Sequence, residues 1–415
     1  MGKTYIADKE TLDKCYNILS ADGIYGFIEH CTILSPSERI EYIGENKGYT
    51  PMTVNKSTGV ANYGGWAQFP VILANKPWMV KSDGTPDYRL DETDYTKKAD
   101  GTASDVADTD YDGGAFSWLM KIYKQETKIG DDRIVKFSLR KREGFEPIGF
   151  VDDNDDELEG VWIPMFYGSV VSTKMRSSSG LQPCYSLTTA QEKDAIDAFS
   201  SRGRFLGGPI VNVIADLLIM FGKSSNVQEV FGYGNDNGYD ASLSPTYGVK
   251  QNAVISGGQF YGTSDGKSLN KIFHSIVLGS YQQYMRDPYT ISVSGVLKVS
   301  KKYEYDLTAA AYDDTGIDYT KVGDTNWHYP HKYRSIPGFG CVPDDTPPFN
   351  GSTSLGGCDG FVVNAAITAV ARRFGGCGGG AIDGARALNL NGSAGSTDWG
   401  FGAAVLLLPP AGVAA

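Results

Sequence analysis

The most informative pattern in the chain lies at residues 358–410, which read CDGFVVNAAITAVARRFGGCGGGAIDGARALNLNGSAGSTDWGFGAAVLLLPP. Two apolar pieces, ITAVARR at 367–373 and GAAVLLLPP at 402–410, are typical of buried strands. The segments between them consist of glycine, small residues and amides, with few charges. Because binding residues are commonly held on segments braced by a rigid core, this pattern favours a display surface in the C-terminal part of the chain.

The composition indicates a globular chain with an acidic balance. At 415 residues, and roughly 100–200 residues per domain, two to three domains are expected. The 38 basic and 49 acidic residues give a net charge of −11. This argues against nucleic acid as a partner, because duplex binding is driven largely by basic residues that neutralise phosphates. The 25 tyrosines suit a core, and tyrosine is also favoured on recognition surfaces.

The sequence contains no evident targeting signal. Its first residues, MGKTYIADKETLDK, include no apolar segment of the secretory kind. The longest apolar helix candidate has about a dozen residues, which is too short to span a bilayer. We therefore expect a protein that is made in the cytoplasm, has no signal peptide and does not insert into a membrane.

Local patterns predict strands first and helices later. GIYGFIEHCTIL at 23–34 and DRIVKFSLRKR at 132–142 alternate apolar and polar residues as strands do. Thr189 and Glu192 have the spacing of a capping box, which predicts a helix that is stopped by Gly203. A second, core helix is predicted from Pro209 to Gly222. Its apolar stripe consists of Ile210, Val213, Ile214, Leu217, Leu218 and Phe221.

The remaining patterns complete the expected organisation. PYTISVSGVLKVSKKYEYDL at 288–307 predicts a hairpin that turns at Ser294-Gly295. The polar, acidic stretch at 91–114 predicts either a long surface loop or an ordered excursion. We predict an α+β fold with a β-rich N-terminal domain over residues 1–165 and a second domain over residues 166–415.

Candidate metal ligands include two histidines. HYPHKY places His328 and His331 three residues apart, and Asp324 or Asp344 could supply a third ligand. Nothing in the sequence specifies such a set, so a structural or surface role is favoured.

A second candidate is DTDYDGG, which places Asp108, Asp110 and Asp112 as in the first half of an EF-hand loop. The twelfth position is Leu119, so the bidentate glutamate is missing. An acidic turn is favoured, and a calcium site of another kind stays open. The prediction is no metal and no cofactor.

Motifs for nucleophilic catalysis are absent. The sequence has no GxSxG, no Walker A and no HExxH. GGCGGG at 375–380 lacks the Lys-Ser/Thr that completes a phosphate-binding loop. Cys358 and Cys377 flank one glycine-rich region and could pair, although free thiols are the default. We predict no catalytic residue.

The spacing of short motifs in residues 358–410 resembles the C-terminal variable region of diversity-generating-retroelement variable proteins. These proteins carry a C-type lectin fold of the formylglycine-generating-enzyme type. The matching pieces are Arg373-Phe374-Gly375-Gly376, Ala387-Leu388-Asn389-Leu390-Asn391 and Trp399-Gly400-Phe401-Gly402-Ala403. The two predicted helices, GGQFYGTSDGKSLNKIFHSIVLGSYQQYM at 257–285 and the hairpin follow the order of that lectin-like domain. KSDGTPDYRLDETDYTKKADGTASDVA at 81–107 is similar to phage and prophage proteins of gut bacteria.

The resemblance implies a C-type-lectin-like domain over 166–415, with a variable region at about 358–402. It implies a hypervariable receptor-binding protein of a phage or prophage tail tip, with a virion location and a homotrimeric state. Its partner would be a host cell-surface protein or glycan, and the 1–165 part would attach to the virion or oligomerise. The varied, ligand-binding positions carried over are Phe361, Val362, Val363, Asn364, Gly378, Gly379, Asp383, Ala387, Asn389, Asn391, Ser396, Asp398 and Gly400.

Within the same resemblance, Arg372, Arg373, Trp399 and Phe401 look like scaffold. The chain departs from the family in two ways. The tryptophan often found after the double glycine is missing, and the glycines at 378–380 offer little side-chain surface. The paired active-site cysteines of the enzyme relatives have no match, which argues against oxidase activity. Two alternatives stay open, an enzyme of the formylglycine-generating class and a purely structural virion protein.

Overall fold

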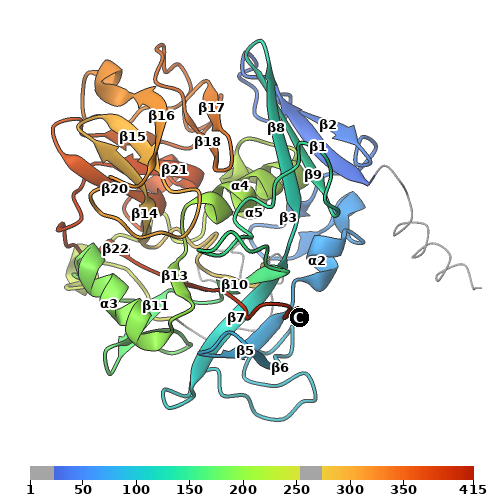
Figure 1. The fold of residues 1–415 in the computed structure, drawn as a ribbon, viewed down its shortest axis with the longest axis vertical. Helices are drawn as coiled ribbons and strands as arrows, with labels where there is room; N and C mark the ends of the chain where they lie inside the picture. The colour runs from blue at the N-terminus through green and yellow to red at the C-terminus, as the bar shows by residue number, and fades with distance from the viewer. Residues whose placement is uncertain (1–22, 253–272) are drawn as a thin grey trace, which may run out of the picture.

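The computed structural model describes residues 23–252 and 273–415. Strands make up 33% and helices 13%, so the class is β-rich and of the α+β kind, as predicted. In Figure 1 a sheet of N-terminal strands and a sheet of C-terminal strands lie on either side of helix α4 (Pro209–Gly222). Residues 257–272, the first part of the segment matched to the lectin-like domain at 257–285, lie outside the described residues.

The N-terminal sheet is antiparallel, in the order β2-β1-β9-β8. The two segments that alternate apolar and polar residues form its central pair, β1 and β9, with Ile24 opposite Ser138. The prediction of strands in both segments is therefore confirmed. The strands are β1 (Ile24–Glu29), β2 (Ile40–Gly44), β8 (Tyr123–Ile129) and β9 (Asp132–Ser138).

A central sheet joins segments that are far apart in the sequence. Its order is β13-β23-β10-β7-β5-β6. The last apolar piece of the chain forms β23, which lies between β10 and β13 and is fully buried, so the predicted closing strand is confirmed. The strands are β5 (Pro77–Lys81), β6 (Pro86–Arg89), β7 (Gly113–Met120), β10 (Gly160–Pro164), β13 (Gly203–Phe205) and β23 (Val405–Leu407).

The C-terminal sheet has the order β16-β15-β14-β20-β21-β19, and β22 pairs with β14. The predicted hairpin is β14 and β15, and its turn residues Ser294 and Gly295 both have positive φ, as a two-residue hairpin turn requires. ITAVARR lies on β20, as predicted. The strands are β14 (Tyr284–Val293), β15 (Val296–Val299), β16 (Asp313–Asp318), β19 (Phe361–Val363), β20 (Thr368–Phe374), β21 (Gly384–Leu390) and β22 (Phe401–Gly402).

In the described part of the chain, the remaining strands form three two-stranded ribbons. They are β3 (Thr53–Val54) with β4 (Ala61–Asn62), β11 (Gly168–Val171) with β12 (Lys174–Ser177), and β17 (Tyr333–Ile336) with β18 (Gly340–Pro343). The short helices are η1 (Gly64–Trp66), α2 (Pro70–Ala74), α5 (Val227–Phe231), η2 (Ala241–Leu243), η3 (Tyr319–Val322) and η4 (Gly380–Ile382).

The two predicted helices are present, with one correction. The core helix α4 has the predicted bounds, and its apolar stripe is buried. Helix α3 (Thr189–Phe199) is capped by Thr188 and Gln191, one residue before the predicted pair. Thr188 has extended backbone, so its hydroxyl can accept the Gln191 N–H, at 3.2 Å. Gly203 lies beyond the end of α3 and begins β13.

The acidic stretch at 91–114 is an ordered excursion rather than a loose loop. Its order comes from a repeated Asp-x-Thr turn, in which the carboxylate accepts both the N–H and the hydroxyl of the threonine two residues later. The hydroxyl bonds measure 2.5–2.6 Å in Asp91/Thr93, Asp94/Thr96 and Asp100/Thr102.

One hydrophobic core runs through both predicted domains. It includes Trp66 and Trp118 from the N-terminal part together with Leu217 and Leu407 from the C-terminal part. The predicted boundary at 165/166 therefore falls inside a continuous core, because β23 inserts between strands from both sides.

A buried ion network also links the N-terminal and C-terminal sheets. Glu29 on β1 lies 2.8–3.0 Å from guanidinium nitrogens of Arg39, Arg133 and Arg386. Arg133 in turn donates to both carboxylate oxygens of Asp216 on α4, at 2.6–2.7 Å. Each of these side chains is 5% exposed or less. Removing any one of them would therefore change the balance of charge among the buried groups that remain.

Candidate ligand-binding pocket

A pocket of about 330 Å³ opens at the C-terminal sheet. Ligand pockets measure roughly 300–1,000 Å³, so this one has room for a small group or a single ring. Its lining combines aromatic, amide, charged and glycine residues: Tyr284, Trp327, Arg372, Gly376, Cys377, Gly378, Gly379, Ile382, Asn389, Asp398, Trp399, Gly400 and Phe401.

Strand register sets the floor of the pocket. Arg286 on β14 is paired with Arg372 on β20, and Arg372 is paired with Asn389 on β21. Strand β22 adds Phe401 beside Tyr284 of β14. Since residues paired across strands share one face of a sheet, this register gathers the side chains from four strands.

Adjacent arginines on β20 have opposite environments. Because successive strand residues face opposite sides, Arg373 turns into the interior and donates to Asp287 at 2.9 Å. Arg372 lies on the pocket side, with its guanidinium carbon 3.8 Å from the centroid of the Phe401 ring. Burial, helped by the nearby Arg286, lowers the pKa of Arg372 to about 10, so the group stays charged at neutral pH.

An aromatic cluster supports the rim. Trp399 packs against Tyr239 and Tyr247, with ring centroids 5.6 and 5.3 Å away, and the two tyrosines stack on each other at 6.0 Å. Tyr239 is 53% exposed. The carboxylate of Asp398 accepts the N–H of Gly400 at 2.8 Å, which fixes the turn that carries Trp399.

The glycine loop between β20 and β21 wraps around one buried carboxyl group. Gly376 donates its N–H to Asp383 at 3.1 Å, and a Cβ on Gly375 or Gly379 would lie 2.0–2.1 Å from atoms of the Asp383 carboxyl group. Gly378 is different, because a Cβ there would make only ordinary contact with Tyr239, at 3.9 Å. Burial, together with Asp236, raises the pKa of Asp383 well above its usual range.

The structure brings together part of the predicted binding set. Gly378, Gly379, Asn389, Asp398 and Gly400 all line the pocket. The other surface positions lie close by in the chain. Asn391 donates its N–H to the Asn389 side chain at 2.9 Å and accepts from Asn364 at 3.2 Å, and Ser396 is partly exposed in the loop after β21.

The remaining positions are corrected by their burial. Phe361, Val362, Val363 and Ala387, on β19 and β21 of the C-terminal sheet, are at most 2% exposed. Asp383 is 1% exposed under the glycine loop. These side chains do not reach the surface, and Gly379 has no space for a side chain.

Sequence reasoning missed several members of the pocket. Tyr284, Trp327 and Ile382 line it, and Tyr239 and Tyr247 support it, yet they come from four separate segments. The high tyrosine content was the one available signal. Arg372, Trp399 and Phe401, predicted as scaffold, also line the pocket.

The cysteines are free thiols and buried in the described part of the chain, and Cys358 and Cys377 do not pair. Burial raises the pKa of the Cys377 thiol to about 11, so at neutral pH it is protonated and a poor nucleophile.

The candidate metal ligands do not assemble. No group of three or more His, Cys, Asp or Glu side chains with metal-binding geometry occurs within 23–252 and 273–415. Asp324 is bonded to His328 at 2.8 Å, and Asp108 accepts the N–H of Asp110, also at 2.8 Å, in an acidic turn before β7.

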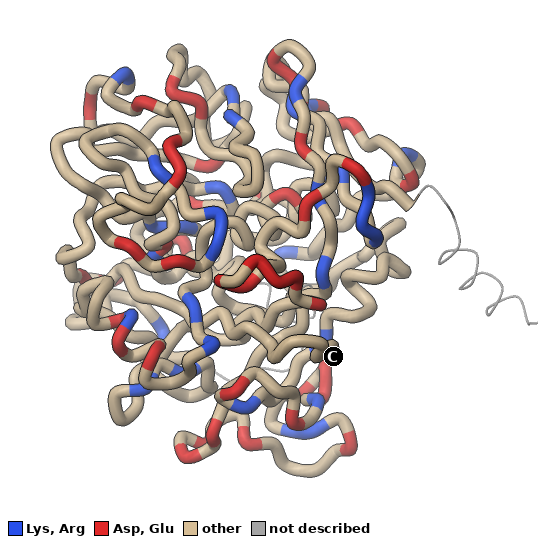
Figure 2. Tube along the Cα trace, viewed as in Figure 1, with Lys and Arg blue, Asp and Glu red and all other residues tan. Residues whose placement is uncertain are grey.

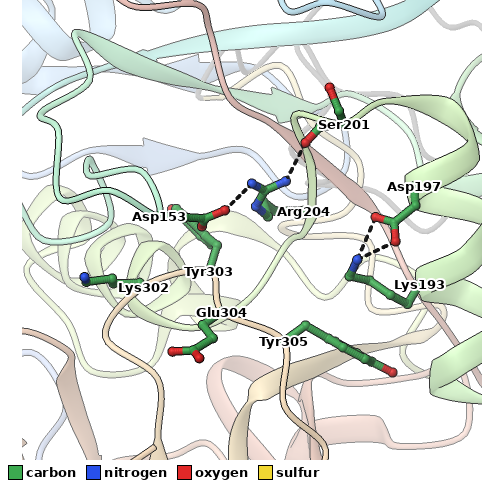
Figure 3. Close-up of a pocket in the computed structure, with 9 residues that line it drawn as sticks. All are labelled: Asp153, Lys193, Asp197, Ser201, Arg204, Lys302, Tyr303, Glu304 and Tyr305. Atoms are coloured by element: carbon green, nitrogen blue, oxygen red, sulfur yellow. Dashed lines mark hydrogen bonds and ion pairs between the residues drawn. The ribbon is translucent and has the colours of Figure 1, made fainter. Parts of the chain in front are cut away.

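A second pocket, of about 610 Å³, lies beside α3 (Figure 3). Four of its charged side chains pair with one another, Lys193 with Asp197 at 2.6 Å and Arg204 with Asp153 at 2.5 Å. Lys302 pairs with Asp155, which lies outside the lining, at 2.6 Å. The carboxylates of the first two pairs are about half exposed, so solvent already stabilises them. None of the predicted binding residues lies in this pocket.

Acidic and basic residues are interspersed along the trace in Figure 2 rather than gathered into one basic stripe. Among the described helices, none combines the length and hydropathy that a membrane span needs. No protein-family model matches the chain, and no curated protein matches it.

Proposed function

We propose that this protein is a non-catalytic recognition protein whose C-terminal pocket binds a receptor on a bacterial surface. The observation that carries the proposal is the pocket itself. Aromatic side chains, an amide and a guanidinium meet there, on segments braced by buried strands. Recognition sites favour this mixture, because aromatic rings supply contact area and amides supply both donors and acceptors.

The resemblance of residues 358–410 adds the biological setting. A lectin-like variable protein of a phage or prophage tail tip uses a fixed scaffold and varied surface residues. Asn389, Asn391, Ser396, Asp398 and Gly378 are the positions that combine the resemblance with space for a varied side chain. A virion location and a homotrimer belong to the same proposal.

Binding to intact cells tests the recognition function. Fluorescently labelled full-length protein is mixed with a panel of gut bacteria, and the variants Trp399→Ala and Asn389→Ala are compared with the unmodified chain. The expected result is binding to some strains, with at least tenfold weaker apparent affinity in both variants. Arg204→Gln, in the second pocket, is the control and is expected to bind normally.

The same assay separates the alternatives. Unchanged binding after replacement of the pocket residues would place recognition outside this pocket, and no binding by the unmodified chain would favour a purely structural virion protein. An enzyme of the formylglycine-generating class predicts a reactive cysteine pair or a metal in a cleft, which metal analysis and thiol labelling would detect. Flanking DNA with no reverse transcriptase gene and no near-copy of codons 358–402 would count against the retroelement setting.

A further inference from the structure

The pocket contains a buried guanidinium group that forms no ion pair or hydrogen bond with the described residues. Three arginines lie close together on β14 and β20, and two have their own carboxylates: Arg286 with Glu192 at 2.7 Å, and Arg373 with Asp287 at 2.9 Å. Arg372 is 7% exposed, and within residues 23–252 and 273–415 none of its guanidinium nitrogens has a hydrogen-bond or ion-pair partner.

A bound anion would supply the hydrogen-bond partner that the Arg372 guanidinium lacks. A buried charge without a hydrogen-bonded partner is costly, because it has lost its hydration. The contact with the Phe401 ring compensates for this loss only in part, because a cation–π contact is weaker than an ion pair with two hydrogen bonds. A guanidinium presents paired N–H donors, which match a carboxylate or phosphate best.

The surroundings narrow the class of anion. Asp398 also lines the pocket, and its negative charge disfavours a dianion such as a phosphate monoester. One of its oxygens accepts the Gly400 N–H, which leaves the second as an acceptor for ligand hydroxyls. Asn389, opposite Arg372 in the register, adds an amide that can donate and accept.

The walls favour a ring with apolar faces. Trp327, Trp399 and Tyr284 are partly exposed aromatic side chains at the pocket, and Ile382 adds an aliphatic surface. Aromatic walls, hydroxyl acceptors and one guanidinium together suit a saccharide unit that carries a carboxylate. A volume of about 330 Å³ accommodates one such unit rather than a chain.

We propose that the pocket binds a carboxylate-bearing sugar residue of a surface glycan, of the uronic or sialic acid class, with the carboxylate on Arg372. This inference rests on the recognition function proposed above. Trp399 stacks on the ring of the sugar, and Asp398 and Asn389 bond to its hydroxyls.

Glycan-array binding and calorimetry with the full-length protein test the inference. The probes are oligosaccharides ending in glucuronate, galacturonate or N-acetylneuraminate, each beside its carboxyl-reduced neutral counterpart. The expected result is at least tenfold tighter binding to one acidic probe, a preference that Arg372→Gln removes. Arg372→Lys keeps the charge without the paired donors, and we expect an intermediate affinity.

Because Arg372 is buried, Trp399→Ala provides a second variant near the surface, and circular dichroism establishes that each variant is folded. Equal binding to acidic and neutral probes would overturn the carboxylate subsite and leave recognition intact. The subsite would also be overturned by cell binding that survives periodate but is lost after protease treatment, since the receptor would then be a protein. If the unmodified chain bound none of the bacterial strains, the recognition function itself would be refuted.

Discussion

Replacing Glu29 with glutamine should destabilise the whole fold. The carboxylate is fully buried, and its two oxygens accept hydrogen bonds from Arg39, Arg133 and Arg386. Glutamine keeps the size of the side chain and removes its charge. Arg133 keeps Asp216, and Arg39 keeps three backbone carbonyls. Arg386 loses its carboxylate contact on Glu29, so a buried cation remains on β21 that keeps the Tyr333 ring at 3.8 Å but has lost its ion-pair partner.

The expected loss is about 3–5 kcal/mol, the usual cost of removing one partner from a buried ion pair. Urea unfolding followed by tryptophan fluorescence measures it as a shift of the midpoint. Glu41→Gln is a matched control, because Glu41 is 55% exposed and lies 3.0 Å from His30. Its loss should stay below about 1 kcal/mol. A Glu29→Gln midpoint indistinguishable from that control would refute the reasoning.

The pH dependence adds a second readout. Although burial acts to raise it, the three guanidinium groups hold the pKa of Glu29 below its ordinary range. A carboxyl group with a lowered pKa stabilises the folded state above its unfolded pKa of about 4.3, and this contribution is lost as the pH falls. Wild type should therefore weaken faster than Glu29→Gln between about pH 5 and pH 2.

Three further predictions concern single positions. Gly378→Ser should leave the melting temperature nearly unchanged, whereas Gly379→Ser should lower it, because a Cβ at position 379 would clash with Asp383. Equal melting temperatures for the two variants would contradict this prediction. Burial raises the pKa of Asp236 to about 6, so the free energy of unfolding should fall as the pH rises from about 4 through 6. Asp236→Asn should reduce this pH dependence in thermal melts recorded at several pH values. An unchanged pH dependence in the variant would contradict the prediction. Leu217→Ala on α4 should lower the free energy of unfolding in urea by about 2–5 kcal/mol, because the side chain is fully buried. A loss below about 1 kcal/mol would mean that neighbouring side chains move in to fill the cavity.

Much of the local structure was readable from the sequence. The stripe of α4, the hairpin at Ser294-Gly295 and the closing strand before Pro409 follow from periodicity and turn chemistry, which act between near neighbours. Residues 385–410 carry few charges because two of their segments, β21 and β23, are buried strands. The resemblance also predicted Asn389 and Asp398 as binding positions, and both line the pocket.

Tertiary structure decided what lies beside those elements. The pairing of Arg372 with Asn389 depends on the register of β20 and β21, and sequence spacing does not specify register between strands. Tyr284 and Trp327 reach the pocket from distant segments, and Glu29 reaches Arg386 across 357 positions of the chain. Burial separated Phe361 and Ala387 from the surface positions, because only packing determines which face of a strand meets solvent.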